Sequence, residues 1–536
     1  MTLRRLNKKD ITTLAEQVGW FSLTEAEVEQ YVTLTSAVLD LLDEVGDPRD
    51  GEVISSSRGS DTAVQRNPGR NPRDGEDPLN AIVRWCNVKD PTSSGELNGL
   101  RIAFKDAISI AGVPMTLGSS VIGEFAPGKD SVVAERVLRA GGEIVAITNM
   151  DSFAFSGGAD TSAHGLIRNP FDVSRSTGGS SGGSAASLFY SKVIDASIGC
   201  DQGGSIRLPA AWCGVLGLKP THSLVPYTGI AGIDATFDHA GPMARTAPVL
   251  ARLLAAIAGP DPSDPRQHGV GPFDVTPLLD VAQGKVGGLE GVRIGVIREG
   301  FSDDDDMRAR TSQAVREFAN NLATAGVEVD EVSVPEHLTA GGIAFAGFIE
   351  GMAALLRGGG NGYHWSGRYA PDFAIAIARG LQSRGAELPP QIKLVYLLGE
   401  YLGRDYGGAV YAAAQNQRPG LRAAYDAQLD RFDFLLLPTA PYPAYAHDSS
   451  LGIAERVLRG FEPLGNCAPF DMTGHPAITL PATSVDGLPV GVMLVGRRFE
   501  DARLVEMASL VEQRFGWNTG CAVESIVDLG PEKLLF

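Results

Sequence analysis

The sequence predicts an α/β protein with a mixed, mainly parallel central sheet covered by helices and an N-terminal helical appendage. Two patterns support this fold class. From residue 101 onward, short runs rich in β-branched residues alternate with helix-like segments, as in chains that build strand–helix–strand units. Residues 10–45 instead carry apolar side chains at helical spacing, which is typical of amphipathic helices.

The N-terminal segment is expected to form a helical hairpin followed by a linker. Thr24 precedes Glu25 and Glu27, an arrangement typical of a helix N-cap. Residues 46–78 are polar, rich in Gly, Pro and Ser, and lack periodicity, so we expect them to be a linker. The predicted organisation is therefore a helical region with linker, a main domain, and a smaller α/β lobe within that domain, at residues 1–76, 77–536 and about 289–430.

The main domain begins with a clear alternation of elements. The predicted elements in its first part are a strand at 101–105, a helix at 131–142, a strand at 143–148, a strand at 193–199 and a helix at 207–214. The smaller lobe opens with a strand within 288–300, a helix at 310–326 and a strand at 327–335, and further strands follow within 432–443 and 478–498. This alternation indicates a sheet covered by helices.

Composition limits the classes of function. The formal charge of −18 and pI near 4.9 argue against nucleic-acid partners, which require a basic face. No stretch approaches the roughly 18 to 20 apolar residues of a membrane span, and the N-terminus lacks the apolar core of a signal peptide. We therefore expect a cytoplasmic protein with no membrane partner. The five cysteines, which we expect to be reduced because they form no Cys-x-x-Cys pair, are Cys86, Cys200, Cys213, Cys467 and Cys521.

The sequence offers no convincing metal or cofactor site. The run Asp303 to Asp306 is better explained as a solvated loop, because four consecutive carboxylates do not converge on one ion without local help. The His-Glu-x-x-His and P-loop patterns are absent from the sequence, and each would carry specific chemistry. We expect neither a metal nor an organic cofactor.

Two glycine-rich segments with serines lie about twenty residues apart, TGGSSGGSAAS at 177–187 and GCDQGGSIR at 199–207. The first contains Gly-x-Ser-x-Gly around Ser180, but that nucleophile motif requires a preceding strand, and here the preceding residues are turn-forming. A Ser/His/Asp triad at this point is therefore disfavoured. The glycines run directly into a helix-like stretch, so they are interpreted as a turn that opens a helix, with a flexible linker as the alternative.

The second segment has a better context for catalysis. A strand-like run enters a glycine turn, and an apolar helix follows. The backbone N–H groups that can converge there, as an oxyanion hole requires, belong to Gln202, Gly203, Gly204 and Ser205. Cys200 is a poor candidate nucleophile, because a reactive thiol needs an electropositive partner such as His.

A serine nucleophile needs a base within hydrogen-bond reach. His164 and His222 flank the segments, but neither stands in a distinctive context. Lys105 ends an apolar strand and is the other candidate. Its pKa would have to fall from about 10.4 to roughly 7 or 8, which corresponds to about 4 kcal/mol of desolvation or local field. Taken alone, Lys105 is better explained as a strand-end lysine that reaches solvent. Its occurrence together with both serine segments favours catalysis.

These segments resemble the signature of the amidase signature family. The match runs through GGSSGGSAAS and GCDQGGSIRLPAAWCGVLGLKPT, with one extra residue between the two serines relative to the usual spacing. It continues in IAFKDAISIAGVPMTLGS, TNMDSFAFSGGADTSAHGLIRNP, DHAGPMART and NCAPFDMTGHPAITLPA, covering residues from about 78 to 515. The helical extension and GCDQGGSIR are most similar to bacterial enantioselective amidases associated with nitrile metabolism. Cys200 departs from the family pattern.

The resemblance implies a Ser-cisSer-Lys triad, with Ser205 as nucleophile, Ser180 as a bridging serine with a cis peptide, and Lys105 as base. It also implies an oxyanion hole at Gln202, Gly203 and Gly204. Residues 153–158 should line the acyl pocket by the same analogy, with Phe155 in its wall and Ser156 hydrogen-bonding substrate. Supporting roles are expected for Ser181, Asp201 as anchor of the glycine turn, and a structural His475 in the Thr473–Gly474–His475 segment.

The function implied is hydrolysis of a small-molecule carboxylic amide to an acid plus ammonia or an amine, through an acyl-enzyme. The helical appendage suggests a homodimer, with packing on the main domain as the alternative. Three other functions stay open: an aryl-amide, carbamate, urea or ester hydrolase using the same triad, the amidase component of a glutamine-dependent tRNA amidotransferase, and a non-catalytic scaffold on this fold.

Overall fold

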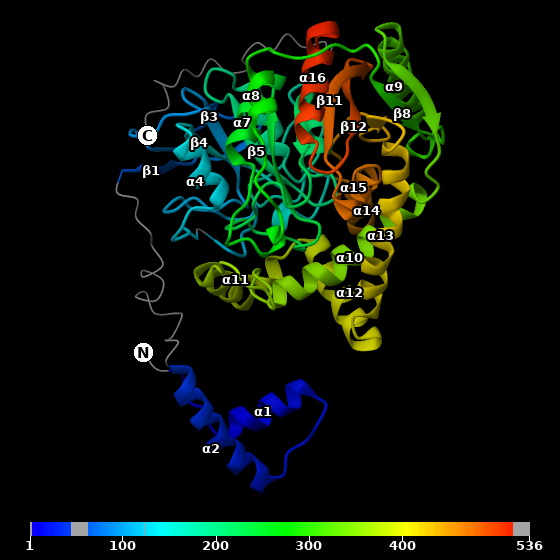
Figure 1. Ribbon diagram of the computed structural model, residues 1–536. Helices are drawn as coiled ribbons and strands as arrows, with labels where there is room; N and C mark the ends of the chain where they lie inside the picture. Colours follow the sequence, from blue (N-terminus) through cyan, green and yellow to red (C-terminus); the bar gives the residue numbers. More distant parts are fainter. Residues whose placement is uncertain (1–2, 44–62, 124, 518–536) are drawn as a thin grey trace. The chain divides into compact units, whose positions relative to one another are not determined.

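The computed structural model describes residues 3–43, 63–123 and 125–517 (Figure 1). The chain divides between Ser60 and Asp61 into two compact units. The predicted Cys521 thiol lies outside the described residues. The other four cysteines are buried and free, in agreement with the expectation of reduced thiols.

The first unit is the predicted helical hairpin. It consists of α1 (Lys8–Val18) and α2 (Glu25–Leu42). The Thr24 hydroxyl accepts a hydrogen bond from the Glu27 N–H, and the Glu27 carboxylate accepts one from the Thr24 N–H. This reciprocal pair satisfies two of the four donors that a helix start leaves open, so the sequence correctly located the beginning of α2.

The predicted linker is wrong over residues 65–70, which form the strand β1 (Gln65–Arg70). This strand pairs antiparallel with β2 (Ile82–Lys89), with a shift in register between Asn67 and Arg70. Within β1, Arg66 forms a short ion pair with Asp130, and this ion pair holds the strand in place. The sequence did not predict this strand because it contains Pro68 and Gly69, and both residue types are tolerated mainly in edge strands.

A single sheet of twelve strands forms the centre of the second unit, in the order β1-β2-β4-β3-β5-β7-β6-β11-β12-β10-β8-β9. The remaining strands are β3 (Arg101–Lys105), β4 (Glu143–Thr148), β5 (Ala196–Asp201), β6 (Leu216–Lys219), β7 (His239–Ala244), β8 (Arg293–Ile297), β9 (Glu328–Val332), β10 (Phe434–Pro438), β11 (Ala477–Val485) and β12 (Leu488–Val495). The predicted α/β class and mixed sheet are confirmed.

The expectation of a mainly parallel sheet is wrong. Parallel pairing occurs at β4–β3, β3–β5, β10–β8 and β8–β9. The other interfaces, from β1–β2 to β10–β12, are antiparallel. For β11 and β12 the reason is connection length, because a tight turn at Asp486 and Gly487 joins them and a hairpin of this kind can only be antiparallel.

The helices cover this sheet. They are α4 (Val132–Arg139), α5 (Gly182–Ala186), α6 (Arg207–Cys213), α7 (Ala247–Ile257), α8 (Thr276–Ala282), α9 (Asp306–Thr324), α10 (His337–Arg357), α11 (Pro371–Arg384), α12 (Pro390–Tyr406), α13 (Ala409–Leu429), α14 (Ile453–Phe461), α15 (Ala468–Thr473) and α16 (Asp501–Phe515). The acidic run predicted as a loop opens α9, where Asp305 caps the helix by accepting from the Arg308 N–H.

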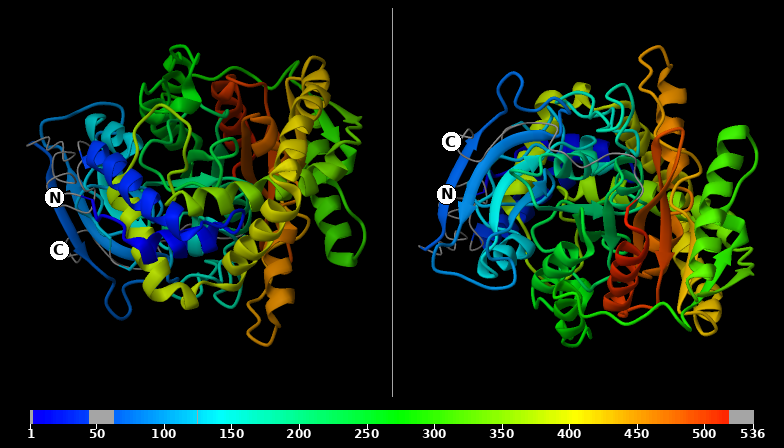
Figure 2. Two further views of the ribbon diagram at one scale, coloured as in Figure 1. Left: turned by 90° about the horizontal axis from the view of Figure 1, so that it is seen from below. Right: turned by 90° about the horizontal axis from the view of Figure 1, so that it is seen from above.

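The segment from 289 to 430 has no sheet of its own within the described residues. Its strands β8 and β9 extend the common sheet beyond β10, and α10, α11 and α12 form a helical layer that lies below the sheet in the view of Figure 1 and is seen from below in the left view of Figure 2. Helix α10 packs against α12, α13 and α15. This layer brings α10 toward the ends of β5 and α6, where the serine segments lie.

By length and apolar composition, α10 qualifies as a membrane span, and it is the one described helix that does. The expectation that no stretch of the chain is long and apolar enough is therefore wrong for α10. The buried residues of α10 include Ala344, Phe348 and Met352, which pack in the protein core. A buried core helix can match a membrane helix in length and apolar composition.

Candidate active site

Lys105 lies at the end of β3 and is completely buried. Its Nζ donates a hydrogen bond to Ser180 Oγ at 2.7 Å. Burial lowers the pKa of the Lys105 ammonium from its usual range, against the opposing influence of Cys200, Asp151, Asp201 and Asp238. A lysine in such surroundings can lose its proton more readily than an exposed one.

Ser180 lies in the first glycine turn, directly before α5. The Gly179–Ser180 peptide bond is cis, as the family resemblance implied. Gly179 admits no side chain, because a Cβ at that position would lie 1.9 Å from Asp151 Oδ2. The turn is therefore packed tightly against the loop after β4, which places Ser180 opposite Lys105.

The two serine segments are joined through Ser181 and Ser205. The Ser181 N–H donates to the Ser205 carbonyl at 3.1 Å. The Ser181 hydroxyl donates to the Cys200 carbonyl at 3.1 Å and accepts from the Cys200 N–H at 3.3 Å. Ser181 thus supports the loop, as predicted. Among the described residues, no hydrogen bond joins the hydroxyls of Ser180 and Ser205, so the link between these segments runs through the backbone.

Asp201 anchors the second glycine turn. Its carboxylate accepts hydrogen bonds from the N–H groups of Gly204 at 2.6 Å and Ile206 at 3.0 Å. The carboxylate also accepts from Arg207 Nε at 3.0 Å. Burial opposes ionisation of Asp201, but the Arg207 guanidinium prevails and lowers the pKa of that carboxyl. The predicted structural role of Asp201 agrees with this geometry.

One N–H group of the predicted oxyanion hole already has an acceptor. The Gly204 N–H donates to the Asp201 carboxylate and is therefore not free to bind an oxyanion. In the part of the chain that the structure describes, the N–H groups of Gln202, Gly203 and Ser205 have no protein acceptor. Buried N–H groups are almost always paired, so three unpaired ones in this turn are available to bind an oxyanion. The candidate donors that remain are the N–H groups of Gln202, Gly203 and Ser205.

Arg207 joins the turn to the rest of the core. It is fully buried and pairs with Asp201 at 2.9 Å and Asp471 at 2.5 Å. The sequence reading did not identify this role, although the GGSIR motif contains the arginine. The partner Asp471 comes from α15, and no local pattern connects it to residue 207.

Replacing Asp201 with Ala should destabilise the protein strongly. The change leaves the buried Arg207 with one carboxylate and frees the Gly204 and Ile206 N–H groups, which costs about 3 to 5 kcal/mol for a broken buried pair. Urea unfolding of the Asp201→Ala variant measures this loss. The control is Asp172→Ala at the exposed Asp172–Arg175 pair, where about 0 to 1 kcal/mol is expected. Equal losses in both variants would contradict the anchoring role.

The histidines near the motifs have other partners. His164 Nε2 bonds the Thr116 hydroxyl at 2.9 Å, and His222 contacts Ser223 and the Ala235 carbonyl. His475 is held between the Thr473 hydroxyl at 2.8 Å and Asp426 at 2.9 Å, in agreement with its predicted structural role. No described histidine bonds Ser180 or Ser205.

A pocket of about 720 Å³ opens over the second turn. Gln202, Gly203 and Ser205 form its floor, and Phe155 and Ser156 line it as predicted. The Ser156 hydroxyl accepts from the Gly158 N–H at 3.0 Å. The remaining wall is mostly apolar and includes Ile233, Phe345, Phe348, Leu458, Phe461, Leu464 and Ala468. Sequence reasoning missed Phe345 and Phe348, since on α10 they have the spacing of ordinary core residues.

Tyr227 positions the side chain of Gln202, another contact that the sequence did not reveal. Gln202 Nε2 donates to Tyr227 Oη at 2.7 Å, and Tyr227 Oη donates to the Ala231 carbonyl at 3.1 Å. The Arg266 guanidinium lies 4.7 Å from the ring centroid of Tyr227. The tyrosine is therefore fixed on both sides and restrains one residue of the oxyanion turn.

We expect Tyr227→Phe to lower kcat with little change in KM. The variant keeps the ring but frees Gln202, and a loosened oxyanion donor weakens the transition state more than the ground state. A loss of about tenfold is expected, equal to the roughly 1.4 kcal/mol of a typical hydrogen bond. Steady-state kinetics provide the measurement. A rise in KM at constant kcat would instead indicate a change in substrate binding.

Comparison with known proteins is consistent with this geometry. The amidase family matches residues 87–505. An enantioselective amidase from Rhodococcus rhodochrous is 35% identical over 93% of this chain and 93% of its own length. A glutamyl-tRNA(Gln) amidotransferase subunit from Synechococcus sp. is 37% identical over 78% of this chain and 84% of its own. The solved peptide amidase from Stenotrophomonas maltophilia shares 28% identity at a TM-score of 0.65, covering 82% and 90% of the two chains.

The fold and the two serine turns thus define a hydrolase of the amidase signature class. The chain belongs to the amidase family.

Proposed function

We propose that this protein hydrolyses carboxylic amides to an acid and ammonia or an amine through an acyl-enzyme. The observation that carries the proposal is the buried Lys105 Nζ, 2.7 Å from Ser180 Oγ, beside a turn with three free N–H donors. A lysine without its proton is a base, and the serine next to it can carry a proton to and from the nucleophile.

The reaction begins when Ser205 Oγ attacks the amide carbonyl. Its proton moves to Ser180 Oγ while the Ser180 proton moves to Lys105 Nζ. The N–H groups of Gln202, Gly203 and Ser205 stabilise the negative oxygen of the tetrahedral intermediate. The proton then returns through Ser180 to the amide nitrogen, the C–N bond breaks, and an acyl ester remains on Ser205. Water hydrolyses that ester by the same proton relay.

The size and the mostly apolar lining of the pocket favour a substrate with a bulky, apolar acyl group. Phe155 and Phe461 pack edge to face with ring centroids 5.3 Å apart, and Phe345 adds a second such contact to Phe461 at 5.2 Å. A wall of this kind gains from burying apolar surface. Charged side chains, Glu455, Arg459 and Glu462, are the exceptions in the lining.

A substrate panel tests this proposal. Primary amides, anilides, carbamates and esters of the same apolar acids are compared by kcat/KM, with Ser205→Ala as the control for background hydrolysis. The expected result is hydrolysis of the amides, with faster turnover of aryl-substituted than of short-chain acids. Preference for carbamates or esters over amides would reassign the bond. No hydrolysis and no labelling of Ser205 by a fluorophosphonate would indicate a non-catalytic protein.

A second candidate function is that of a tRNA amidotransferase component. The 37% identity to the Synechococcus amidotransferase protein favours it. The match covers 78% of this chain, whereas the Rhodococcus amidase covers 93%, and we therefore prefer the independent enzyme. Copurification of stoichiometric partner proteins from the native host would favour the amidotransferase.

We also propose that the α1–α2 hairpin mediates homodimerisation. Two helices bury little surface by themselves, and large apolar side chains of this unit are exposed, among them Trp20 at 91%, Leu41 at 71% and Phe21 at 57%. Light scattering should give twice the mass of the 56.5 kDa chain. Replacing Trp20, Phe21 and Leu41 with Ser should give the monomer. A variant that stays dimeric would contradict the assignment.

A further inference from the structure

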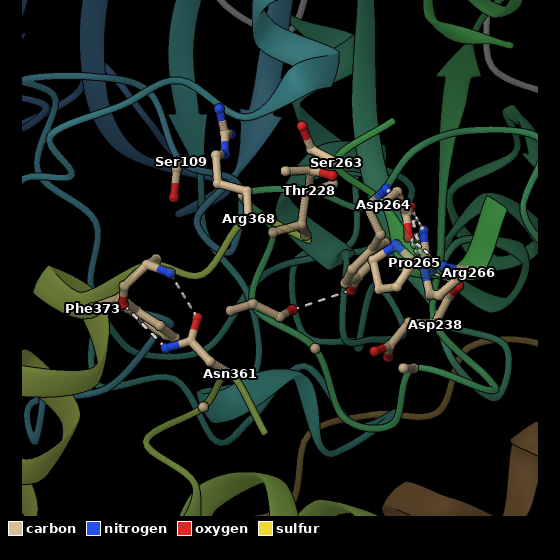
Figure 3. Close-up of a pocket in the computed structure, with 18 of the residues that line it drawn as sticks. Ser109, Thr228, Asp238, Ser263, Asp264, Pro265, Arg266, Asn361, Arg368 and Phe373 are labelled. Carbon is tan, nitrogen blue, oxygen red and sulfur yellow. Dashed lines mark hydrogen bonds and ion pairs between the residues drawn. The ribbon is translucent and has the colours of Figure 1, made fainter. Parts of the chain in front are cut away.

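Two smaller cavities lie near the candidate active-site pocket, and the lining residues that neighbouring cavities share place the three in a series. The nearer one, called the neck here, has a volume of about 10 Å³ and shares Ala154 with the active-site pocket. The farther one, called the outer cavity, has a volume of about 80 Å³ and is drawn in Figure 3. The residues common to the neck and the outer cavity are Ala231, Gly232, Gly360 and Phe373.

A hydrogen bond shows that the outer cavity lies close to the second glycine turn. Tyr227 lines the outer cavity, and its hydroxyl accepts the hydrogen bond from Gln202, which lines the active-site pocket. The side chains of Tyr227 and Gln202 therefore lie between the outer cavity and the second glycine turn. The series runs from the reacting centre toward α11 and the loop before it.

The chemistry changes along the series. The neck is lined by apolar side chains and glycines, including Leu117, Met352 and Ile377. A volume of about 10 Å³ accommodates a single molecule the size of water or ammonia. An apolar passage excludes an ion, because a charge loses its hydration there. The neck therefore suits a small neutral molecule.

The outer cavity has polar and charged side chains in its lining, which the neck lacks. Asp238, Arg266, Ser109 and Arg368 line it, with Asp238 and Arg266 on one side of the view and Ser109 and Arg368 on the other (Figure 3). Asp238 accepts the Ile233 N–H through Oδ1, and among the described residues its Oδ2 has no hydrogen-bond partner. A molecule with N–H groups that leaves the neck meets this free acceptor.

The proposed reaction creates a need for such a passage. When the C–N bond of a primary amide breaks, the nitrogen takes the relayed proton and leaves as neutral ammonia, while the acyl group stays on Ser205. A bulky acyl group then fills the active-site pocket. We propose that the neck is a rear exit, through which ammonia passes to the outer cavity while the acyl-enzyme occupies the main pocket. This inference rests on the proposed amidase function.

A matched pair of variants tests the exit. Ala231 and Ala235 are both half-buried and both line the outer cavity, but only Ala231 also lines the neck. Ala231→Leu narrows the passage, and Ala235→Leu adds the same side chain away from it. Ala231→Val is a milder version, in case the leucine prevents folding. Thermal unfolding verifies that each variant folds.

The experiment follows ammonia in the reverse direction. The acyl-enzyme is generated from the p-nitrophenyl ester of an accepted acid, ammonia is added, and the ratio of amide to free acid is measured. This ratio does not depend on which step limits turnover. Ala231→Leu should lower this ratio about tenfold. Nitrophenol release is measured alongside, because nitrophenol is too large for the neck and because the Ala231 carbonyl holds Tyr227. Ala235→Leu should behave as the wild type.

Several results would overturn the proposal. An unchanged amide-to-acid ratio in folded Ala231→Leu would mean that ammonia uses the main opening. An equal loss of ester hydrolysis would mean that the neck supplies water, or that the site itself is disturbed. A wild-type enzyme that hydrolyses the ester but forms no amide would also exclude ammonia access. If the wild type cleaves neither ester nor amide, the proposed function itself fails, which is a distinct outcome.

Discussion

Ser205→Ala should lose about 10⁴- to 10⁶-fold in kcat, because removal of a serine nucleophile leaves only the residual effect of the oxyanion donors and binding. The fold should persist. Ser205 lies in a turn that is held by the Asp201 carboxylate and the Ser181 backbone, and neither contact uses the Ser205 hydroxyl. Hydrolysis of a primary amide, with circular dichroism as a check of folding, gives the measurement.

The matched control is Ser181→Ala. This variant also removes one buried hydroxyl from the serine segments, but the hydroxyl lost is the one that bonds the Cys200 backbone. We expect it to keep most of its activity and to lose stability, by about 1 kcal/mol for a buried hydrogen bond. Retention of more than a few per cent of the rate in Ser205→Ala, or equal losses in both variants, would refute Ser205 as nucleophile.

Lys105→Ala should lose about 10²- to 10⁴-fold, the usual range for removal of a general base. Lys105→Arg should not restore activity, because a guanidinium stays protonated at all accessible pH values. In the wild type the base acts only when neutral. Burial lowers the pKa of Lys105 below 10.5, so kcat/KM should be constant above that pKa and fall as the pH drops through it.

A second buried lysine provides the control for this pH profile. Burial also lowers the pKa of Lys219, to about 8, but its Nζ donates to the Pro220 carbonyl at 3.0 Å and touches neither serine. Lys219→Met should therefore keep the acid limb of the wild-type profile, whatever its stability. The assignment of Lys105 as the base is wrong if the fall of kcat/KM at low pH is absent in Lys219→Met but is still seen in the remaining activity of Lys105→Ala.

The local elements were predictable because they depend on neighbours in sequence. The strands at 101–105 and 143–148 coincide with β3 and β4, and Thr24 starts α2 as its capping pattern indicated. The failures have a common cause. The strand β1 contains Pro68 and Gly69, and it is recognisable only through its pairing with β2. Antiparallel pairs such as β6 with β11 and β10 with β12 join segments far apart in the chain.

The same division holds at the site. Glycines at 178 and 179, an apolar strand before Lys105, and an Asp ahead of the second turn are visible in the sequence, and they indicated where the chemistry would lie. Which N–H groups stay free was not visible. The Gly204 N–H is excluded from the candidate donors because it donates to Asp201. The Ser205 N–H, already a candidate from the sequence, has no acceptor among the described residues.

The sequence by itself determined the positions of elements such as α2, β3 and β4, the two serine turns and the lysine that ends β3. Only the tertiary structure decided that Lys105 Nζ meets Ser180 Oγ, that Arg207 joins Asp201 to Asp471, and that α10 supplies the aromatic wall of the pocket. Local patterns record the conformational preferences of adjacent residues. Contacts between distant segments arise only when the sheet assembles and excludes water from between its layers.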